Sequence, residues 1–389
     1  DPGGDITRYE YDSFGNRTRS IVFLDSGDLT DPDKQQITTY SYDAFGNLVQ
    51  IVDAEGNTTT QEFDHFGNLL RSVDGNGGVS QFSYDNDNRV LSVIDPEGHV
   101  TTYAYDAVGN RISVTDANGH TITRVYDVNN NLLATIDPSN SDPAADRIRH
   151  FRYDVVGNQT TVVDAEGRET SYVYDARRQL VEVVTPEVAS DDGVTLTRYS
   201  STFAYDGEGK QIRTTNNRGF TTELVYTPNG VLRQQTDPLG HVTRFDYDAN
   251  MNRVTIIAGF QLPAAKRQIL HFGFDEEDHR ISETDAEGFT THAAFDAPGN
   301  LVSVTDANGN TTDFEFDKNN RLIREIFAEV YDAATGTYTR HVVEHRYDAN
   351  GNEVESVDEN GNSTHFFFDR DNQVVMVEDA NGIKTVFDY

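Results

Sequence analysis

The sequence predicts an all-β protein in which tandem hairpins form one continuous antiparallel sheet. Three observations support this class: an aromatic residue followed by Asp recurs along the chain, the spacing between these pairs is regular, and no segment sustains a helical period for ten residues. Of the sixteen intervals between Tyr11 and Tyr389, eleven are 21 residues, three are 31 and two are 27. The repeats account for the whole chain, so we expect residues 1–389 to be a single array.

The segment after each aromatic residue is typical of a turn. With the aromatic residue as position zero, position +1 is Asp in fifteen of the sixteen units, the exception being Thr227. Position +4 is Gly in nine units and Asn in four, and position +5 is often Asn. Gly and Asn both tolerate a positive φ, so we predict a turn whose +4 residue is left-handed.

A second turn is predicted in the other half of each unit. Position +14 is Gly in all eleven units of 21 residues, after leads such as Asp-Ala-Asn, Asp-Ala-Glu and Asp-Pro. This is β-turn chemistry, and a left-handed residue is expected here as well. Each unit therefore contains two turns, which we call the aromatic-Asp turn and the second turn.

The segments between the turns are predicted to be strands, about 32 in all for sixteen units. Residues 48–52 and 301–305 are rich in β-branched residues and too short for helices. The returning segment ends with aromatic residues at positions −2 and 0, as at Tyr40 and Tyr42. A spacing of two places both rings on one face of a strand, so we expect aromatic ladders across successive hairpins.

The longer units gain six or ten residues near the second turn. The insertions lie at residues 138–150, 185–198, 257–268 and 328–339. We therefore expect the loops of variable length to project from one edge of the sheet. Within the third insertion, residues 263–267 are predicted to be a loop or a short helical turn.

The residues expected to carry the repeat structure are the aromatic, Asp, Gly and Asn positions of four units, together with the second-turn glycines. They are Tyr42, Asp43, Gly46, Asn47, Gly56, Tyr105, Asp106, Gly109, Asn110, Gly119, Phe295, Asp296, Gly299, Asn300, Gly309, Tyr347, Asp348, Gly351, Asn352 and Gly361.

Composition excludes several classes of function. The formal net charge is −34, which argues against nucleic acid as a partner because phosphates require Lys and Arg. There is no Cys, so disulfides, thiolate metal sites and cysteine nucleophiles are excluded. No run of about 18 apolar residues is present, so no membrane-spanning helix is expected in this segment.

One segment imitates a catalytic motif. His341-Val342-Val343-Glu344-His345 fits the H-x-x-E-H pattern of inverted zincins, which requires a helix that carries both histidines. Here the segment leads directly into Tyr347, so we predict a strand and no zinc site. An active site is needed once, whereas every strong motif here is repeated, and we therefore expect no catalytic residue, no cofactor and no enzymatic activity.

Calcium binding at the Asp- and Asn-rich turns is a weaker alternative to the expectation that the chain has no cofactor. Residues 85–88 and 127–131 offer several oxygen ligands, but no unit supplies the bidentate Glu of an EF-hand in register. Asp at the start of a turn more often caps its own backbone amides.

Four segments carry a resemblance to a known family. Residues 42–48, 105–111, 295–301 and 347–353 resemble the YD repeat of bacterial Rhs proteins, which also occurs in toxin-complex C subunits, wall-associated proteins and teneurins. The resemblance implies an antiparallel ribbon that spirals into a hollow shell. In Rhs and toxin-complex members the shell encloses a toxin, and in teneurins it is an adhesion scaffold at the cell surface.

The chain departs from a full family member. It starts and stops within a repeat, so we expect it to be a segment of a longer protein. Asp237-Pro238-Leu239-Gly240 resembles part of the motif that terminates the shell, but it occupies an ordinary second-turn position. We find no toxin domain and no terminator with its self-cleavage aspartates.

These observations predict a non-enzymatic scaffold, part of a secreted or cell-surface protein whose β-shell encloses or presents a polypeptide cargo such as a toxin. The expected partners are neighbouring repeats of the same or like chains, an enclosed cargo and a cell-surface or carbohydrate receptor. The alternatives are an extended extracellular fibre or adhesin built from the same repeats, and a carbohydrate-binding or carbohydrate-active module.

Overall fold

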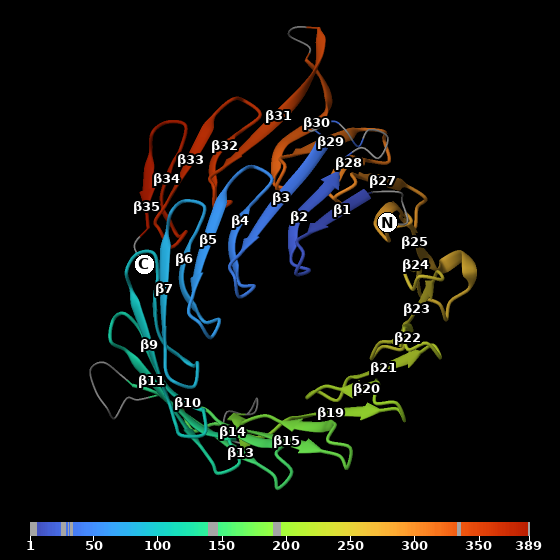
Figure 1. Cartoon of the computed structure of the whole chain (residues 1–389). Coiled ribbons are helices and arrows are strands. Elements are labelled where there is room, and N and C mark those ends of the chain that lie inside the picture. The colour runs from blue at the N-terminus through green and yellow to red at the C-terminus, as the bar shows by residue number, and fades with distance from the viewer. Residues whose placement is uncertain are drawn as a thin grey trace. The chain divides into compact units, whose positions relative to one another are not determined.

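The computed structural model describes residues 6–24, 29, 31, 34–138, 147–189, 196–332 and 336–387. Within these residues the chain is all-β, with one short 3-10 helix (Figure 1). Thirty-three strands belong to one antiparallel sheet, and β17 and β18 form a separate pair. The predicted fold class is confirmed.

The chain divides into two compact units, which we describe separately. Unit 1 comprises Asp1–Val100 and Leu270–Tyr389, and unit 2 comprises Thr101–Ile269. We call residues 6–100 of unit 1 the N-terminal arm and residues 270–387 the C-terminal arm. Strands β9 and β25 cross the two boundaries between the units.

The N-terminal arm contains β1 (Ile6–Tyr11), β2 (Arg17–Phe23), β3 (Gln35–Tyr42), β4 (Leu48–Val52), β5 (Thr58–Phe63), β6 (Leu69–Val73), β7 (Val79–Tyr84) and β8 (Val90–Ile94). The C-terminal arm contains β26 (Arg280–Thr284), β27 (Thr290–Phe295), β28 (Leu301–Thr305), β29 (Thr311–Phe316), β30 (Leu322–Asp332), β31 (Thr337–Tyr347), β32 (Glu353–Val357), β33 (Ser363–Phe368), β34 (Val374–Glu378) and β35 (Lys384–Val386).

Unit 2 and the strands at its boundaries comprise β9 (Val100–Tyr105), β10 (Arg111–Thr115), β11 (Thr121–Tyr126), β12 (Leu132–Asp137), β13 (Arg147–Tyr153), β14 (Gln159–Val163), β15 (Glu169–Tyr174), β16 (Leu180–Val184), β17 (Val188–Ala189), β18 (Leu196–Thr197), β19 (Ser200–Tyr205), β20 (Gln211–Thr215), β21 (Thr221–Tyr226), β22 (Leu232–Thr236), β23 (Val242–Tyr247), β24 (Arg253–Ala258), the 3-10 helix η3 (Ala264–Lys266) and β25 (Gln268–Phe274).

The two kinds of turn differ in strand register. At the aromatic-Asp turn between β3 and β4, Ser41 pairs with Gln50 but Tyr42 pairs with Leu48, so Val49 is an extra residue in the ladder. The same shift occurs before the aromatic residue in all sixteen units. At the second turn the pairing continues without a shift up to Val52 and Thr58. The bulge therefore bends the ladder once in every repeat, at a fixed position.

The predicted left-handed positions are confirmed. Gly46 has a φ of +87°, and all eleven second-turn glycines also have positive φ. Position +4 is left-handed even in the three units that carry neither Gly nor Asn there, at Arg178, Met251 and Asp278. The local turn geometry thus prevails over the steric preference of these three side chains.

The sheet has little conventional core. Among the described apolar residues only Ile21, Phe23, Ala134 and Phe245 are buried. In strands such as β4 and β28 every residue is half-buried, which is the pattern of a sheet that is not covered by a second layer. Stability must therefore come mainly from contacts between neighbouring strands, as in other repeat proteins.

The four predicted insertions follow β12, β16, β24 and β30, and the fifth longer unit, which starts at Tyr11, has its additional residues between β2 and β3. Residues 263–267 contain the 3-10 helix η3, which confirms the expected short helical turn. The hairpin of β30 and β31 is extended to eleven residues in each strand. Residues 139–146, 190–195 and 333–335 of the predicted loops lie outside the described residues.

The prediction of aromatic ladders is wrong. The strands that carry the position-zero aromatics of successive units are not neighbours in the sheet. The reason is geometric: β10 lies between the strands of Tyr105 and Tyr126, so these rings are about two strand spacings, roughly 10 Å, apart. Instead, the ring can be covered by the +5 residue of the preceding unit. His279 stacks on Phe295 at 4.6 Å, and the Arg321 guanidinium lies 4.9 Å from the Tyr347 ring centre.

Candidate functional site: the repeat turns and the seam of unit 1

Each aromatic-Asp turn is closed by the carboxylate of its Asp. In the turn 43–47, Asp43 Oδ1 accepts hydrogen bonds from the backbone amides of Phe45 (2.8 Å) and Asn47 (2.9 Å). Asp43 Oδ2 accepts a third from Asn47 Nδ2 at 2.9 Å. The Gly46 amide donates to the Asp43 carbonyl, and the Asp43 amide donates to the Asn47 carbonyl. Five hydrogen bonds thus form within the turn itself.

The second turn uses the same network. Asp53 accepts from the amides of Glu55 (3.0 Å) and Asn57 (2.8 Å) and from Asn57 Nδ2 (2.9 Å). The two turns are described separately above, and their common hydrogen-bond network is not predicted there. The signal that identifies it is the spacing Asp-x-x-Gly-Asn, which occurs at residues 43–47 and again at 53–57.

At several turns these hydrogen bonds favour the ionised form of the carboxylate. The side-chain hydrogen bond from Asn110 and the backbone amides of the turn hold the pKa of Asp106 below its ordinary value. The Asn side chain is likewise the largest cause of the lowered pKa at other such turns, at Asp12, Asp43, Asp64, Asp127, Asp306 and Asp358. Much of the negative charge is therefore part of the turn structure.

The last residue of the turn can be replaced by other hydrogen-bond donors. His99, His241 and His279 place Nδ1 at 3.1, 2.8 and 3.1 Å from Oδ2 of the Asp four residues earlier. In the turn 317–321, Arg321 Nε donates to Asp317 Oδ2 at 2.6 Å. A side-chain donor at this position is common but not required, because the turns 74–78, 216–220 and 379–383 end in Gly78, Phe220 and Ile383 and keep the backbone hydrogen bond to the first residue of the turn.

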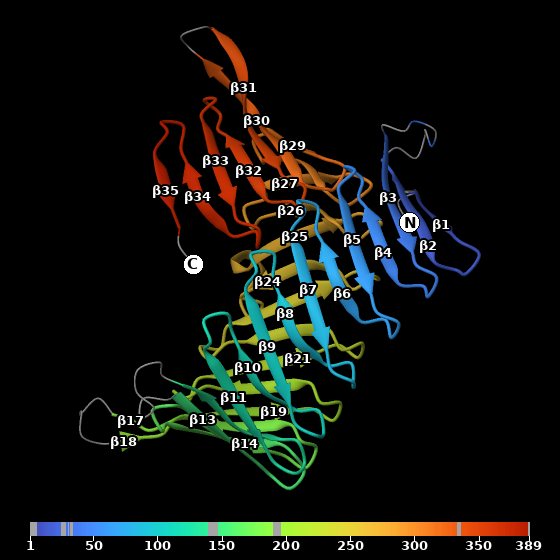
Figure 2. The same ribbon diagram turned by 60° about the vertical axis from the view of Figure 1, so that its left-hand side comes forward.

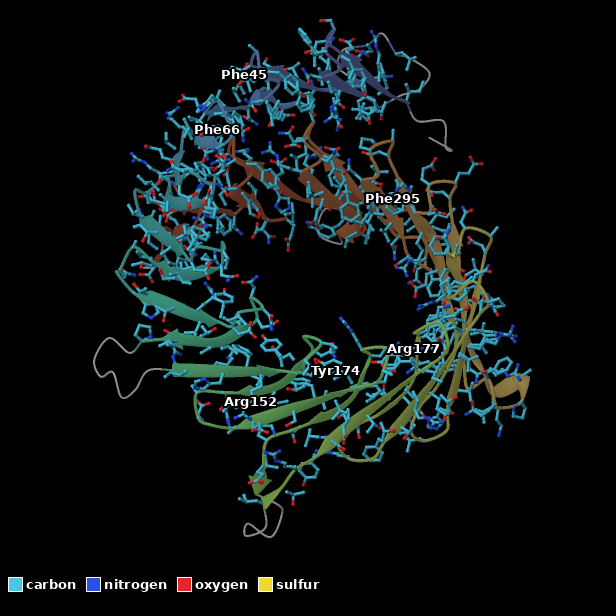
Figure 3. The ribbon with its side chains drawn as sticks, turned by 60° about the horizontal axis from the view of Figure 1, so that its bottom comes forward. Phe45, Phe66, Arg152, Tyr174, Arg177 and Phe295 are labelled. Atoms are coloured by element: carbon cyan, nitrogen blue, oxygen red, sulfur yellow. The ribbon has the colours of Figure 1, made fainter. Side chains whose placement is uncertain are left out.

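Successive repeats are joined by the hydroxyl of the position-zero Tyr. In each case the hydroxyl donates to the carbonyl of position +6 in the preceding unit. The pairs are Tyr42 with Arg17, Tyr84 with Leu69, Tyr126 with Arg111, Tyr174 with Gln159, Tyr205 with Leu180, Tyr226 with Gln211, Tyr247 with Leu232 and Tyr347 with Leu322. Tyr174 is labelled in Figure 3. This bond between repeats, which sequence reasoning missed, explains why Tyr is common at position zero.

Replacing Tyr247 with Phe is expected to lower the free energy of unfolding by about 1 kcal/mol, because the 2.7 Å bond to the Leu232 carbonyl is lost while the ring stays in place. Urea unfolding measures the change. The control is Tyr338→Phe, since Tyr338 is 67% exposed and its change should be close to zero. Equal effects of the two substitutions would contradict the assigned bond.

Within unit 1, turns of the C-terminal arm meet turns of the N-terminal arm, and we call this contact the seam. Three aromatic-Asp turns (317–321, 348–352 and 369–373) contact three consecutive second turns (53–57, 74–78 and 95–99). In the first pair, the Lys318 amide donates to Glu55 Oε1 at 2.8 Å and Asn319 Nδ2 donates to Asp53 Oδ2 at 2.7 Å. In Figures 1 and 2 the red strands β32–β35 lie next to the blue strands of the N-terminal arm.

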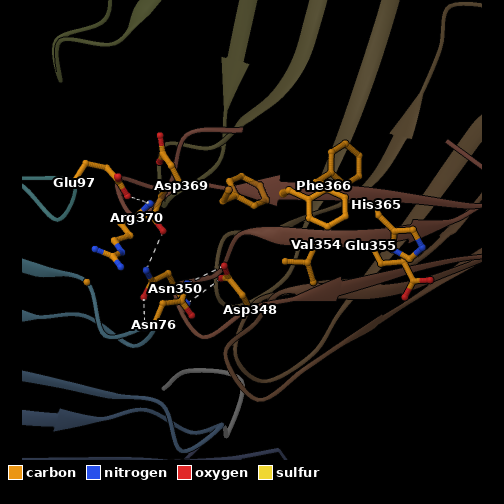
Figure 4. Close-up of a pocket in the computed structure, with 14 residues that line it drawn as sticks. Asn76, Glu97, Asp348, Asn350, Val354, Glu355, His365, Phe366, Asp369 and Arg370 are labelled. Atoms are coloured by element: carbon orange, nitrogen blue, oxygen red, sulfur yellow. Dashed lines mark hydrogen bonds between the residues drawn. The ribbon is translucent and has the colours of Figure 1, made fainter. Parts of the chain in front are cut away.

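The second pair of turns is in tight contact. The Asn76 amide donates to Asn350 Oδ1 at 3.0 Å, and Asn76 Nδ2 donates to Asp348 Oδ2 at 2.9 Å (Figure 4). A Cβ atom on Gly75 would come within 2.7 Å of the Ala349 carbonyl oxygen, so a Gly at residue 75 permits this approach. A pocket beside these turns is lined by Asn76 and Glu97 from one arm and by residues such as Asp348 and Phe366 from the other.

The third pair of turns adds charged groups. Glu97 Oε1 accepts from the Arg370 amide at 2.5 Å, and Asp371 Oδ1 accepts from the Glu97 amide at 3.4 Å. His99 Nδ1 lies 3.1 Å from Asp95 Oδ2 and 3.4 Å from Asp371 Oδ2. Asp95, His99 and Asp371 therefore form a three-residue cluster that spans the seam.

The twenty residues predicted from the sequence are distributed over the repeats and are not brought into one site. The predicted residues of the repeat that begins at Tyr105 lie in unit 2. The predicted residues numbered 42–56 and 295–361 lie in the two arms of unit 1. Among the predicted side chains, that of Asp348 forms a hydrogen bond across the seam. The exposed turn residues Phe45 and Phe66 belong to successive aromatic-Asp turns of the N-terminal arm (Figure 3).

The segment that imitates a zinc motif lies in a strand, as predicted. His341 and His345 belong to β31, where residues four apart are about 13 Å apart along the strand, too far for one metal ion. His345 Nδ1 lies 2.7 Å from Glu353 Oε1, and its Nε2 lies 3.8 Å from Glu325.

Besides the cluster at the seam, the described residues include one other group with the composition of a metal site. It consists of Asp275, Glu277 and His279, whose potential ligand atoms lie within 4.8 Å of one another. The calcium alternative at residues 85–88 and 127–131 stays a prediction. At the latter turn, Asp127 already accepts hydrogen bonds from Asn129 and Asn131.

The sheet, the shared turn network and the bonds between repeats together define a tandem β-hairpin repeat protein. The chain belongs to the RHS Repeat family: the family model matches residues 25–58, 63–102, 84–121, 105–142, 153–187, 295–337 and 347–386, which is more than half of the chain. A comparison with curated proteins found no significant match in sequence.

Solved structures show the same fold. "Crystal Structure of TcdB2-TccC3-Cdc42" is matched with a TM-score of 0.73 and 14% identity, over 96% of this chain and 23% of that one. The Photorhabdus luminescens Tc holotoxin pore with the mutation TccC3-D651A is matched with a TM-score of 0.59 and 14% identity, over 95% of this chain and 24% of that one. "Crystal Structure of TcdB2-TccC3-TEV" is similar, with a TM-score of 0.58, 15% identity and coverages of 95% and 24%. The chain thus spans less than a quarter of the length of these relatives. No helix in the described residues is long and apolar enough to cross a bilayer.

Proposed function

We propose that this chain is a non-enzymatic wall segment of a secreted or cell-surface protein that encloses or presents a polypeptide cargo. The observation that carries the proposal is the seam. Three turns of one arm meet three consecutive turns of the other through hydrogen bonds, so two stretches of the hairpin ribbon are joined side by side through their turns. A continuous wall requires such lateral contacts, because strand pairing alone joins the hairpins only along the ribbon.

The distribution of chemistry supports a structural role. The turn network recurs at both ends of the hairpins, and the tyrosine bond recurs between repeats. Such repetition is expected of a structural element, because a reaction centre is needed only once. Hydrogen bonds within the turns hold their carboxylates, so these groups already have a structural role. Enclosure of a cargo is supported by the likeness in fold to chains of toxin complexes.

The proposal is tested on the full-length protein that contains this chain. Electron microscopy should show closed particles, and limited proteolysis followed by mass spectrometry should find a polypeptide that is protected until the particle is denatured. Long filaments without a protected polypeptide would instead support the extracellular fibre, and the proposal would be wrong.

A further inference from the structure

The aromatic-Asp turn 275–279 joins β25 to β26 in the C-terminal arm and has the sequence Asp-Glu-Glu-Asp-His. Asp275 Oδ1 accepts hydrogen bonds from the backbone amides of Glu277 (3.1 Å) and His279 (2.8 Å), which closes the turn. Asp275 Oδ2 faces the His279 ring, at 3.1 Å from Nδ1. The Glu277 carboxylate is close to both, since the potential ligand atoms of the three side chains lie within 4.8 Å of one another. Three groups able to bind a metal ion therefore converge in one turn.

The next repeat holds the His279 ring in this position. The ring stacks on Phe295, with 4.6 Å between the ring centres and 19° between the planes. A Cβ atom on Gly299 would come within 3.3 Å of His279 Nε2, so the backbone of the following turn lies close to that nitrogen. Because these neighbours restrict the ring, Nδ1 is presented to Asp275 with little freedom left to lose when a ligand binds.

Glu277 carries a carboxylate oxygen that is buried and lacks a hydrogen-bond partner. In the part of the chain that the structure describes, its Oε1 is one of the few buried polar side-chain atoms for which no hydrogen bond forms. The basic residue that follows the turn is paired elsewhere, since Arg280 Nη1 lies 3.2 Å from Glu283 Oε2. A buried carboxylate oxygen without a partner is unfavourable, because burial removes its hydration and nothing replaces it. This oxygen therefore points to a ligand that bears a positive charge.

Other turns with the same two carboxylates contain a cation between them. Arg168 Nε lies 2.7 Å from Asp164 Oδ2, and its Nη2 lies 3.0 Å from Glu166 Oε2. The turn 85–89 places a guanidinium between its first and third residues in the same way. The turn 275–279 keeps carboxylates at its first and third residues but ends in a His, which has no permanent charge. A bound cation would supply the charge that Arg supplies in the other two turns.

We propose that the turn 275–279 binds a zinc ion through Asp275 Oδ2, the Glu277 carboxylate and His279 Nδ1, with water as the fourth ligand. An imidazole nitrogen combined with carboxylate oxygens suits Zn²⁺, whereas Ca²⁺ and Mg²⁺ are held by oxygen ligands. Tetrahedral ligands of zinc lie about 3.4 Å from one another, close to the 3.1 Å between Asp275 Oδ2 and His279 Nδ1. The site differs from the expectation of no cofactor, and it does not depend on what the wall encloses.

The test is a titration of the intact chain with ZnCl₂, after chelator treatment and buffer exchange, read by hydrogen–deuterium exchange. Protection of the peptide that contains residues 275–279 should rise about tenfold when free zinc is ten times the dissociation constant, which calorimetry supplies. Protection of residues 237–241 should stay unchanged. That turn has the same Asp and His, with Nδ1 of His241 2.8 Å from Asp237 Oδ2, but Leu239 stands in place of the Glu.

Two variants remove one ligand each and should still form the turn. Glu277→Leu reproduces the third residue of the turn 237–241, and His279→Asn introduces the residue that Asn300 provides in the next aromatic-Asp turn. Both should lose the zinc-dependent protection of residues 275–279. The matched control is His241→Asn, which should keep the wild-type response at that peptide.

Three results would overturn the site. One is unchanged protection of residues 275–279 in the wild-type chain across the zinc titration. Another is an equal zinc response in wild type and Glu277→Leu, which would show that zinc binds the acidic surface in general. The third is equal protection by CaCl₂ at the same concentration, which would contradict the assignment to zinc.

Discussion

Replacing Gly119 with Val is expected to destabilise the hairpin of β10 and β11 by about 2 kcal/mol. Gly119 has a φ of +80°, a region that a β-branched residue strongly disfavours. A Cβ atom at this position would meet nothing within 4 Å, so the cost comes from the backbone and not from a clash. The free energy of unfolding, measured with urea, reports the change.

The matched control for this prediction is Gly119→Asn. Asn88, Asn130 and Asn320 adopt φ values of 61–65° at left-handed positions of other turns, so Asn should be tolerated at position 119 with a much smaller loss. If Val and Asn had equal effects, or if neither changed stability, the assignment of a left-handed backbone to this turn would be wrong.

Replacing Asn76 with Asp is expected to weaken the seam by about 1–3 kcal/mol. Asn76 Nδ2 donates to Asp348 Oδ2, and the substitution puts a carboxylate in place of that donor. Desolvation acts against ionisation of Asp348, but hydrogen bonds from Asn352 and Asn76 lower its pKa overall, so it is ionised at neutral pH. The new carboxylate would lose a hydrogen bond and repel Asp348.

Hydrogen–deuterium exchange of residues 74–78 and 348–352 at neutral pH measures this effect, and both peptides should lose protection. Asn118→Asp is the control, because Asn118 occupies the same position in the turn 116–120 of unit 2. Its substitution should leave the two seam peptides unchanged. Unchanged protection in Asn76→Asp would contradict the assigned contact.

Local chemistry explains why much of the fold could be predicted. Gly at position +4 or +14 identifies a left-handed turn, and the short segments between turns are too short and too β-branched for helices. Arg178, Met251 and Asp278 show the limit of this reasoning. None of them prefers a positive φ, and the backbone bonds at both ends of the turn hold them there, as the bond from the Arg178 amide to the Asp175 carbonyl illustrates.

The seam could not be predicted from the repeat pattern. Asn76 and Asp348 are 272 residues apart, and a sequence of similar repeats does not indicate which two turns will meet. The aromatic residues illustrate a different limit. Their spacing correctly places two rings on one face, but the expected ladder neglected the strand that lies between successive rings.

The central claim is that turns of the two arms of unit 1 lie against each other, and cross-linking tests it most directly. The chain has no native Cys, so Cys can be introduced at Glu55 and Lys318, which are exposed and adjacent at the seam. The control pair combines Lys318 with Phe45, which lies at the other end of β4, about 17 Å from Glu55 along the strand. With a short bismaleimide at high dilution, we expect an intramolecular cross-link between positions 55 and 318 and much less between 45 and 318. No cross-link at 55 and 318, or equal yields for the two pairs, would contradict the seam.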